Sequence, residues 1–262
     1  MIVSAHMTLE LGEFAKRLEK AGYKAGANLL RALAKSWERE GLIPKKLPIE
    51  KEQINSLELT IEEYRNSPTS PEKATAFWQA FWAENSKKVD ILVSVPKCPY
   101  TQEQLEDMRR KDKGPIYVPE EFSTQKTRHL LGKMFPEMQS HSVEKGNSVI
   151  NEVQNFGWRG FDMSVNAPHL KTNESQLKSA LVSNGEEEPT LNEYIITGQA
   201  SKLLTGKYLD EGVTVSRILG SRHDGGVVGA YFASDGYLGV YLSLFPGSCF
   251  VFLGGRGSSG VN

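Results

Sequence analysis

The sequence predicts an α+β fold, in which a helical N-terminal portion precedes a mixed α/β portion that ends in an antiparallel β-meander. Two observations indicate this class. Apolar residues recur every three or four positions in several segments of the first 205 residues, as in amphipathic helices. From Val227 onward they alternate with a period of two, as in strands. Helices grouped before strands are typical of α+β folds rather than of repeated βαβ units.

We expect two portions, a mainly helical module over residues 1–90 and an α+β domain with a C-terminal antiparallel sheet over residues 91–262. Apolar residues have helical spacing over 9–40 and again over 52–65, which predicts amphipathic helices in both segments. The aromatic residues of 77–82 follow the same spacing, and this is more typical of a buried core than of a site that stacks a ligand.

Capping residues mark several helix boundaries. Ser70 is a predicted N-cap, with Pro71 in the first turn. Thr101 and Thr190 are each followed three positions later by Gln or Glu, as in capping boxes, and Gly206 ends the second of these helices. The basic run 109–113 is interpreted as the solvated end of the helix that begins after Thr101. Further helices are predicted over 123–135 and 172–184.

Strands are predicted where β-branched and aromatic residues dominate. The short apolar run 89–95 ends at Pro96, and 141–166 holds two or three short strands between turns. The Asp-Gly turn at 234–236 is typical of a hairpin. Three adjacent antiparallel strands are predicted around and after it, at 227–233, 237–244 and 249–253.

The composition narrows the range of partners and locations. Lys and Arg number 31 against 32 Asp and Glu, for a net charge of −1, which disfavours nucleic acid because its binders usually carry a basic face. No apolar run approaches the ~18 residues of a membrane span, and the N-terminus lacks the apolar stretch of a secretory signal. Two cysteines, Cys98 and Cys249, are too few for a disulfide framework, so we expect free thiols and a cytoplasmic location.

A cluster of chemically useful side chains lies at 216–224. An imidazole beside a carboxylate can act as a general base, so Ser221, His223 and Asp224 are the candidate catalytic residues. Ser216 is an alternative nucleophile. The structural alternative is a turn, since an Asp followed by two glycines also suits a connection into the next strand.

Basic and glycine residues suggest an anion site. The guanidinium groups of Arg217 and Arg222 are candidate clamps for a phosphate or carboxylate. The tail spells G-x-G-x-x-G, but the sequence ends two residues later and leaves no room for the helix of a dinucleotide site. Gly255, Arg256 and Gly257 could instead form an anion-binding nest, and a frayed terminus is the alternative.

No metal and no cofactor are expected. The five histidines are scattered and none forms a pair with metal-ligand spacing. Cys98 is followed shortly by a predicted helix N-terminus and preceded by Lys97, two features that can depress the pKa of a thiol. A buried or merely exposed thiol is the alternative.

Parts of the second half resemble an uncharacterised family of bacterial hypothetical proteins. The resemblance is carried by SKLLTGKYLDEGVTVSRILGSR at 201–222 and LGGRGSSGV at 253–261, together with 130–138 and the segments 157–158 and 166–174. The family has no established activity, so the resemblance implies no functional residue. It implies that residues 130–262 form one unit.

These observations predict a binding or interaction module without catalysis, and the helical N-terminal portion is a candidate surface for a protein partner. The alternative is a small hydrolase or transferase that acts on a phosphorylated or carboxylated substrate through the 216–224 cluster. That alternative requires Arg222, His223 and Arg256 to converge in one pocket.

Overall fold

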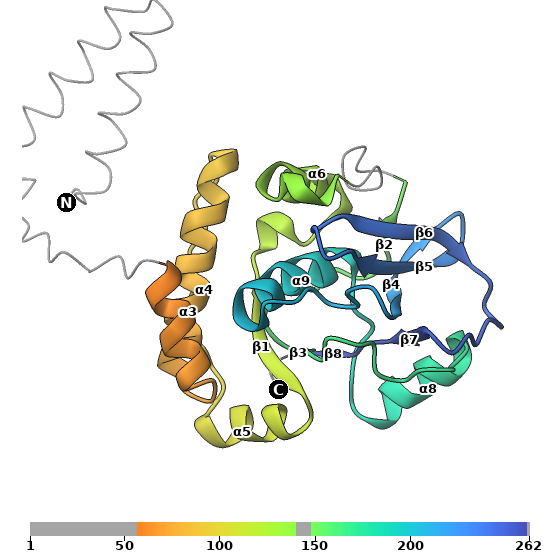
Figure 1. Ribbon diagram of the computed structural model, residues 1–262, viewed down its shortest axis with the longest axis horizontal. Helices are drawn as coiled ribbons and strands as arrows, with labels where there is room; N and C mark the ends of the chain where they lie inside the picture. The colour runs from red at the N-terminus through yellow and green to blue at the C-terminus, as the bar shows by residue number, and fades with distance from the viewer. Residues whose placement is uncertain (1–56, 140–147, 261–262) are drawn as a thin grey trace, which may run out of the picture. The chain divides into compact units, whose positions relative to one another are not determined.

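The computed structural model describes residues 57–139 and 148–260, except the side chain of Ser243 (Figure 1). The chain divides into two compact units, 1–54 and 55–262, and all described residues belong to the second. The helix predicted over 9–40 therefore lies outside the described residues. The α+β class predicted from the sequence is confirmed, with helices and two mainly antiparallel sheets in one unit.

Two N-terminal helices of this unit, α3 (Leu57–Asn66) and α4 (Pro71–Ser86), form part of the common core. Ser70 caps α4 as predicted, accepting from the amide of Lys73. The indole nitrogens of Trp78 and Trp82 donate to the carbonyls of Pro115 and Tyr117, at 2.9 and 3.0 Å. The predicted boundary at residue 90 thus falls within one core, and the aromatic stripe is buried, as the helical spacing indicated.

The apolar run 89–95 is not a strand, and this prediction is wrong. A 3-10 turn, η1 (Lys87–Val89), leads into irregular chain. The carbonyls at the end of this run and of the proline after it bond to side chains instead of to a neighbouring strand. Those of Ser94, Val95 and Pro96 accept from Tyr117 Oη, Gln79 Nε2 and Trp158 Nε1. These donors come from three different elements, and none of the described strands pairs with the segment.

The first sheet has the order β1–β3–β8 and is antiparallel throughout. It consists of β1 (Lys113–Val118), β3 (Gly157–Asp162) and β8 (Ser258–Ser259). Helix α5 (Gln102–Arg110) precedes β1 and begins with the predicted capping box between Thr101 and Gln104. The basic run 109–113 is therefore not a single solvated helix end, because Lys113 belongs to the sheet and its side chain is only 12% exposed.

The second sheet has the order β2–β4–β5–β6, with β7 parallel to β4. Three consecutive strands form a meander, β4 (Val215–His223), β5 (Gly226–Phe232) and β6 (Leu238–Leu244). The short strands β2 (Ile150–Asn151) and β7 (Leu253–Gly255) share the other edge of β4. The predicted strand 249–253 is therefore misplaced. Residues 245–252 carry the chain across the sheet, and the strand that follows pairs with β4 instead of β6.

Helix α9 (Leu191–Thr205) lies at the centre of the unit (Figure 1), and every residue from Leu191 to Ser201 is buried. The predicted capping box at Thr190 and the left-handed Gly206 at its end are both confirmed. Helix α8 (Glu174–Ser183) has a third capping box, from Asn173. The remaining elements are short, namely η2 (Glu120–Phe122), η3 (Gln125–Thr127), α6 (Arg128–Met134) and η4 (Pro136–Met138).

The helix predicted over 123–135 is real only in its second half. Ser123 Oγ and Thr127 Oγ1 donate to the carbonyls three residues before them, those of Glu120 and Thr124. Such local bonds compete with helical ones, so the segment starts just after η2 and contains the 3-10 turn η3 before α6 begins.

A glycine sets the distance between α9 and the second sheet. A Cβ on Gly198 would lie 2.2 Å from Cε2 of Phe232. That ring cannot move aside, because it stacks on Tyr194 and Tyr208 with centroid distances of 5.6 and 4.9 Å. The close approach of helix and sheet therefore requires glycine at this position.

Gly198→Ala will lower the free energy of unfolding by about 1–3 kcal/mol, although the same change in an open helix would raise it by up to about 1 kcal/mol. Urea unfolding followed by circular dichroism measures the difference. Gly247→Ala is the control, because a Cβ at that position would have no described atom within 4 Å, and it will change stability little. A stabilised Gly198→Ala protein would contradict this packing.

Candidate functional site

The residues of the predicted cluster are spread along β4 and the turn after it. Asp224 and Gly225 form the two-residue loop between β4 and β5, with φ of 48° and 77°. Two positive φ values are the signature of a type I′ hairpin turn. Asp224 is exposed, and its carboxylate lies 3.6 Å from Nδ1 of His223. The backbone here has the geometry of the structural alternative, a turn.

Ser221 connects buried elements. Its hydroxyl donates to Asn151 Oδ1 at 2.8 Å and accepts from the amide of Leu191 at 2.9 Å. The same Asn151 oxygen accepts from Arg128 at 2.5 Å. Burial lowers the pKa of Arg128 to about 10, and its guanidinium also donates to Asn192 and to the carbonyl of Val149. The proton of Ser221 is therefore engaged in a network that joins β2, β4 and α9.

The predicted anion clamps lie apart. Arg222 forms ion pairs with Glu152 and Glu174, at 3.0 and 2.7 Å. Arg217 is buried, and Nη2 donates to the carbonyl of Ser248. Its Nε and Nη1 have no hydrogen-bond partner among the described residues, and burial lowers its pKa. Residues 217 and 222 are separated by up to roughly 17 Å of extended chain.

Arg256 is sealed in the interior, where its side chain is 0% exposed. Its guanidinium donates to Asp210 Oδ1 at 3.0 Å and to Ser216 Oγ at 3.0 Å. It also donates to the carbonyls of Ser164 and Val165 and forms a longer pair with Asp162. Burial lowers the pKa of Arg256, but the carboxylates around it raise the pKa above its usual range. All its donors are used within the protein, and it does not converge with Arg222 and His223.

The glycines of the tail serve close packing. Gly255 belongs to β7, where a Cβ would lie 2.1 Å from Leu177. A Cβ on Gly257 would lie 2.3 Å from Glu186 Oε2. The tail is therefore a pair of short strands, with Arg256 between them at the point where the chain passes from the second sheet to the first.

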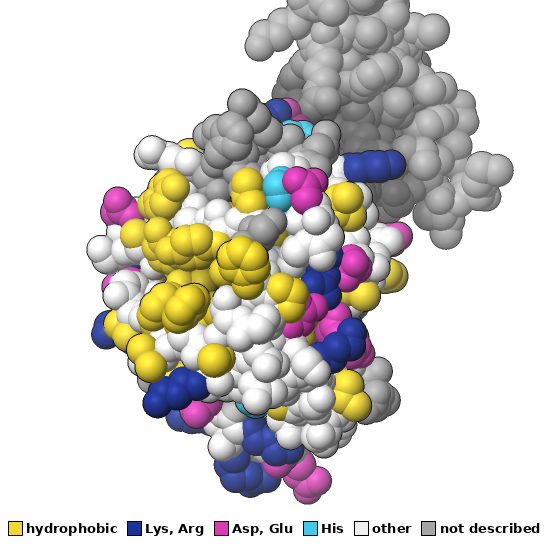
Figure 2. All heavy atoms as spheres, turned by 90° about the vertical axis from the view of Figure 1, so that its right-hand side faces the viewer, with side chains coloured by type: hydrophobic (Ala, Val, Ile, Leu, Met, Phe, Trp, Pro, Cys, Tyr) yellow, Lys and Arg dark blue, Asp and Glu magenta, His cyan; other side chains and the backbone are white. Residues whose placement is uncertain are grey.

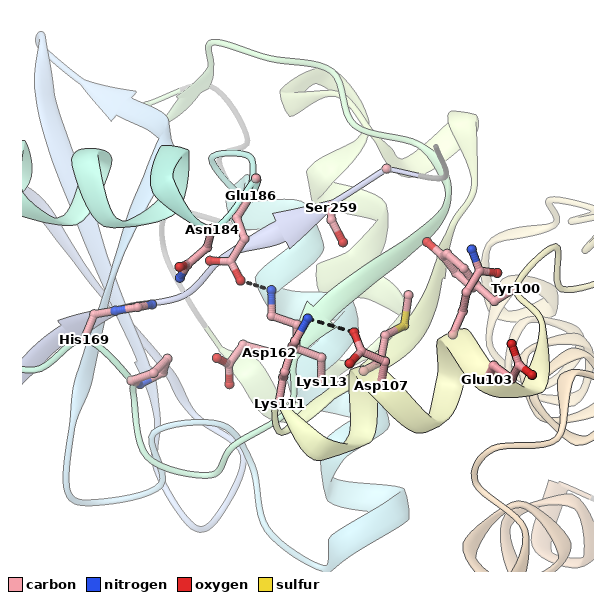
Figure 3. A pocket seen from close by; sticks show the side chains of 15 residues that line it. Tyr100, Glu103, Asp107, Lys111, Lys113, Asp162, His169, Asn184, Glu186 and Ser259 are labelled. Atoms are coloured by element: carbon pink, nitrogen blue, oxygen red, sulfur yellow. Dashed lines mark hydrogen bonds and ion pairs between the residues drawn. The ribbon is translucent and has the colours of Figure 1, made fainter.

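A pocket of about 900 Å³ opens beside this tail (Figure 3). Its walls come from α5, the start of β1, the end of β3, the turn after α8, and β8. The turn after α8 is fixed to β8, because Glu187 and Ser258 exchange backbone hydrogen bonds of 2.6 and 3.1 Å. Glu186 is thereby held over the pocket opposite Lys113.

Three charged side chains form one side of the pocket. Lys113 lies directly across from Asp162 in the pairing of β1 with β3 and forms an ion pair with Glu186 Oε1. Burial lowers the pKa of Lys113, an effect that Asp162 opposes. Both partners of the pair are enclosed, with side chains 12% and 7% exposed. The second oxygen of Glu186, Oε2, has no hydrogen-bond partner among the described residues.

Asp162 also keeps one oxygen free. Oδ1 accepts from the amide of Ser164 at 3.1 Å and lies 3.4 Å from Nη1 of Arg256, whereas Oδ2 makes no hydrogen bond to the described residues. Burial raises the pKa of Asp162 above its usual range, although Arg256 and Ser164 lower it. Shifted pKa values in a pocket are typical of functional sites.

Further polar groups line the same pocket. The hydroxyl of Tyr100 is buried, and burial raises its pKa to about 12, so it carries its proton at neutral pH. The backbone of Gly160 approaches it, but no contact among the described residues has hydrogen-bond geometry. Figure 3 shows Tyr100 and His169 at opposite ends of the pocket, with Ser259 between them. The side chains of His169 and Ser259 make no hydrogen bond within the described part of the chain.

Metal binding has no support in residues 57–139 and 148–260, where no three His, Cys, Asp or Glu side chains gather closely enough to hold an ion. None of the helices described could cross a membrane. Cys98 is buried, and burial raises the pKa of its thiol. That direction is opposite to the one required for a reactive thiolate.

Sequence reasoning missed this pocket. Tyr100, Lys113, Asp162 and Glu186 come from four elements, and no motif spacing connects them. Two signals were present, the basic run 109–113 and the acidic run 186–188, but both suited solvated segments equally well. The charged residues come together only because β1 pairs with β3 and because Glu187 pairs with Ser258 of β8.

The Lys113–Glu186 pair can be tested for its buried character. Lys113→Met will lower the free energy of unfolding by about 3 kcal/mol, because it leaves an uncompensated carboxylate in the interior. Lys111→Met is the control, since Lys111 and its partner Asp107 are 64% and 48% exposed, and exposed pairs contribute little. Equal effects of the two changes in thermal or urea unfolding would contradict the burial of the Lys113–Glu186 pair.

The raised pKa of Asp162 predicts the pH dependence of stability. A carboxyl whose pKa is higher in the folded state loses its stabilising contribution as the pH rises through that folded value. Asp162→Asn cannot titrate, so its stability relative to the wild type will increase as the pH is raised from the acid range to neutrality. Urea unfolding of both proteins across this range measures the trend. A flat or falling difference would show that Arg256 outweighs burial.

No protein-family model matches the chain, and comparisons with curated proteins and with solved structures return no match. The resemblance to bacterial hypothetical proteins therefore stays a prediction.

Proposed function

We propose that residues 57–260 form a binding module whose pocket holds a small, neutral, polyhydroxylated molecule such as a sugar or a cyclitol. One observation carries the proposal. Several polar groups of the residues that line this pocket have no hydrogen-bond partner among the described residues, and buried polar groups are normally hydrogen-bonded. Enclosed concave sites with a few convergent polar groups are where small ligands bind.

The unpartnered groups define what the ligand must offer. Asp162 Oδ2 and Glu186 Oε2 are carboxylate oxygens and can only accept hydrogen bonds while ionised, so the ligand must supply donors. The hydroxyls of Tyr100 and Ser259 can both donate and accept. Hydroxyl groups of a polyol match this mixture, because each one donates to a carboxylate and accepts from a neighbouring hydroxyl.

The charges disfavour an anion. Lys111 is paired with Asp107, and Lys113 with Glu186, so neither lysine offers a free positive charge. A phosphate or carboxylate would also face Asp162. The phosphorylated or carboxylated substrate expected from the sequence is therefore not the class we propose for this pocket.

The charges also disfavour a strong cation. Lys113 already stands opposite Asp162 and beside Glu186, and Arg256 approaches Asp162 from the interior. The positive charges of Lys113 and Arg256 already compensate the two carboxylates that a ligand ammonium would need. A neutral ligand avoids both penalties.

We propose binding without catalysis as the activity of this module. The hydrolase or transferase hypothesis depends on the 216–224 cluster, in which the Ser221 proton is bonded to Asn151 and Arg256 is fully engaged elsewhere. The free thiols of Cys98 and Cys249 agree with the cytoplasmic location that we also propose. The partner surface predicted on the helical N-terminal portion belongs largely to residues outside those described.

Saturation-transfer NMR with glucose, galactose, maltose and myo-inositol tests the proposal on the full chain, with methyl phosphate and putrescine as the anionic and cationic controls. At least one neutral probe will bind in the millimolar range or tighter. Binding of methyl phosphate or putrescine alone, or of none of the six probes, would refute the ligand class.

Tyr100→Phe separates a binding role from a structural one. Its hydroxyl makes no hydrogen bond within the described protein, so removing it will leave the melting temperature unchanged or raise it slightly. The same change will weaken binding of the neutral probe by about tenfold, the effect of one lost hydrogen bond. A lower melting temperature with unchanged affinity would assign the hydroxyl to the fold.

A further inference from the structure

One edge of the second sheet is open. Strand β6 pairs with β5 on one side, and no described strand pairs with its other side. Open edges are usually protected by proline or by lysine and other charged residues, which prevent pairing with another chain. Residues 236–255 contain no Asp, Glu, Lys, Arg or His, and β6 itself has no proline. The edge is therefore built without this protection.

Aromatic side chains are exposed along the same strand and at its ends. Tyr237, Tyr241 and Phe245 are 43%, 49% and 82% exposed. Figure 2 shows hydrophobic side chains gathered on the side of the molecule where β6 and the segment after it lie. At about 200 Å² for each aromatic side chain, these three leave roughly 350 Å² of apolar surface in water. Patches of this size on soluble proteins commonly mark an interface.

We infer that a second copy of this chain occupies the edge, with the two β6 strands paired antiparallel about a two-fold axis at Tyr241. This inference is independent of the pocket, which is lined by the first sheet and the elements around it. Tyr241 is the middle residue of β6 (Leu238–Leu244). The axis therefore places the two tyrosines opposite each other and pairs the strand over its whole length.

The sequence is complementary to itself in this register. Position 238 meets 244 of the second copy, so leucine faces leucine, and position 240 meets 242, so valine faces leucine. Beyond the strand ends, Tyr237 meets Phe245. Apolar residues thus oppose apolar residues at each of these pairs, and aromatic or β-branched cross-strand pairs stabilise sheets. Since the segment carries no charge, two copies approach without like-charge repulsion at any point of the edge.

The size of the contact suits a dimer of moderate affinity. Standard interfaces bury about 800 Å² on each partner, and the exposed aromatic surface supplies nearly half of that. The backbone groups of β6 and its partly buried Val240 and Leu242 add to it. An isologous contact closes after two copies. Both β6 edges are then paired within the dimer, so no further copy can add and no fibre forms.

Light scattering coupled to size exclusion, on the full chain over a range of micromolar concentrations, tests the inference. The wild type will be dimeric at the upper end. Tyr241→Lys places two lysines opposite each other at the axis and will weaken the dimer by about 100-fold. Val182→Lys is the control, because Val182 is 70% exposed on α8, and it will leave the dimer intact. A monomeric wild type, or a dimer indifferent to Tyr241→Lys, would overturn the inference.

Disulfide trapping tests the register, in a Cys249→Ser background that leaves only the buried Cys98. Tyr241→Cys will cross-link with itself under mild oxidation, since directly opposed residues have the Cα separation that a disulfide requires. Tyr237→Cys alone will not, but a mixture of Tyr237→Cys with Phe245→Cys will form the mixed dimer. Cross-linking of Tyr237→Cys with itself, or none by Tyr241→Cys, would exclude a two-fold axis at this residue.

Discussion

The buried pair between Arg256 and Asp210 is the interaction on which most of the structure depends. Asp210 is fully enclosed and accepts hydrogen bonds from Tyr194, Thr214 and Ser216 as well as from Arg256. One carboxylate therefore holds together α9, the start of β4 and the segment between the two sheets. Removing a charge from such a pair leaves the other one unsolvated, which costs far more than an exposed pair contributes.

A second carboxylate has a comparable position. Glu193, which caps α9, is 0% exposed and accepts from Arg159, Asn155 and Ser258. The interior thus contains charged and polar side chains whose hydrogen bonds are nearly all satisfied. Against this background the free oxygens of the pocket stand out. They share the lack of a partner with Nε and Nη1 of Arg217, but, unlike that guanidinium, they belong to residues that line a pocket.

Local features of the fold could be predicted from the sequence, and distant pairings could not. The N-caps at Ser70, Thr101 and Thr190 were predictable, because a cap depends on residues within one turn. The segment 89–95 was misjudged, since its apolar β-branched residues suit a strand and only distant side chains show otherwise. The candidate site followed the same rule. Ser221 and Asp224 are neighbours in sequence but perform different structural tasks, while Lys113 and Asp162 meet only through strand pairing.

The position of Arg256 also has a consequence for the order in which the chain folds. Asp210 and Glu193 can leave water only when their partners Arg256 and Ser258 arrive from the far end of the second unit. Before Arg256 and Ser258 are in place, burying either carboxylate is unfavourable, so α9 cannot pack fully between the sheets. Docking of residues 253–260 and closure of the core must therefore occur as one cooperative step. These contacts join residues widely separated in sequence, and topologies rich in such contacts fold more slowly than those built from local ones.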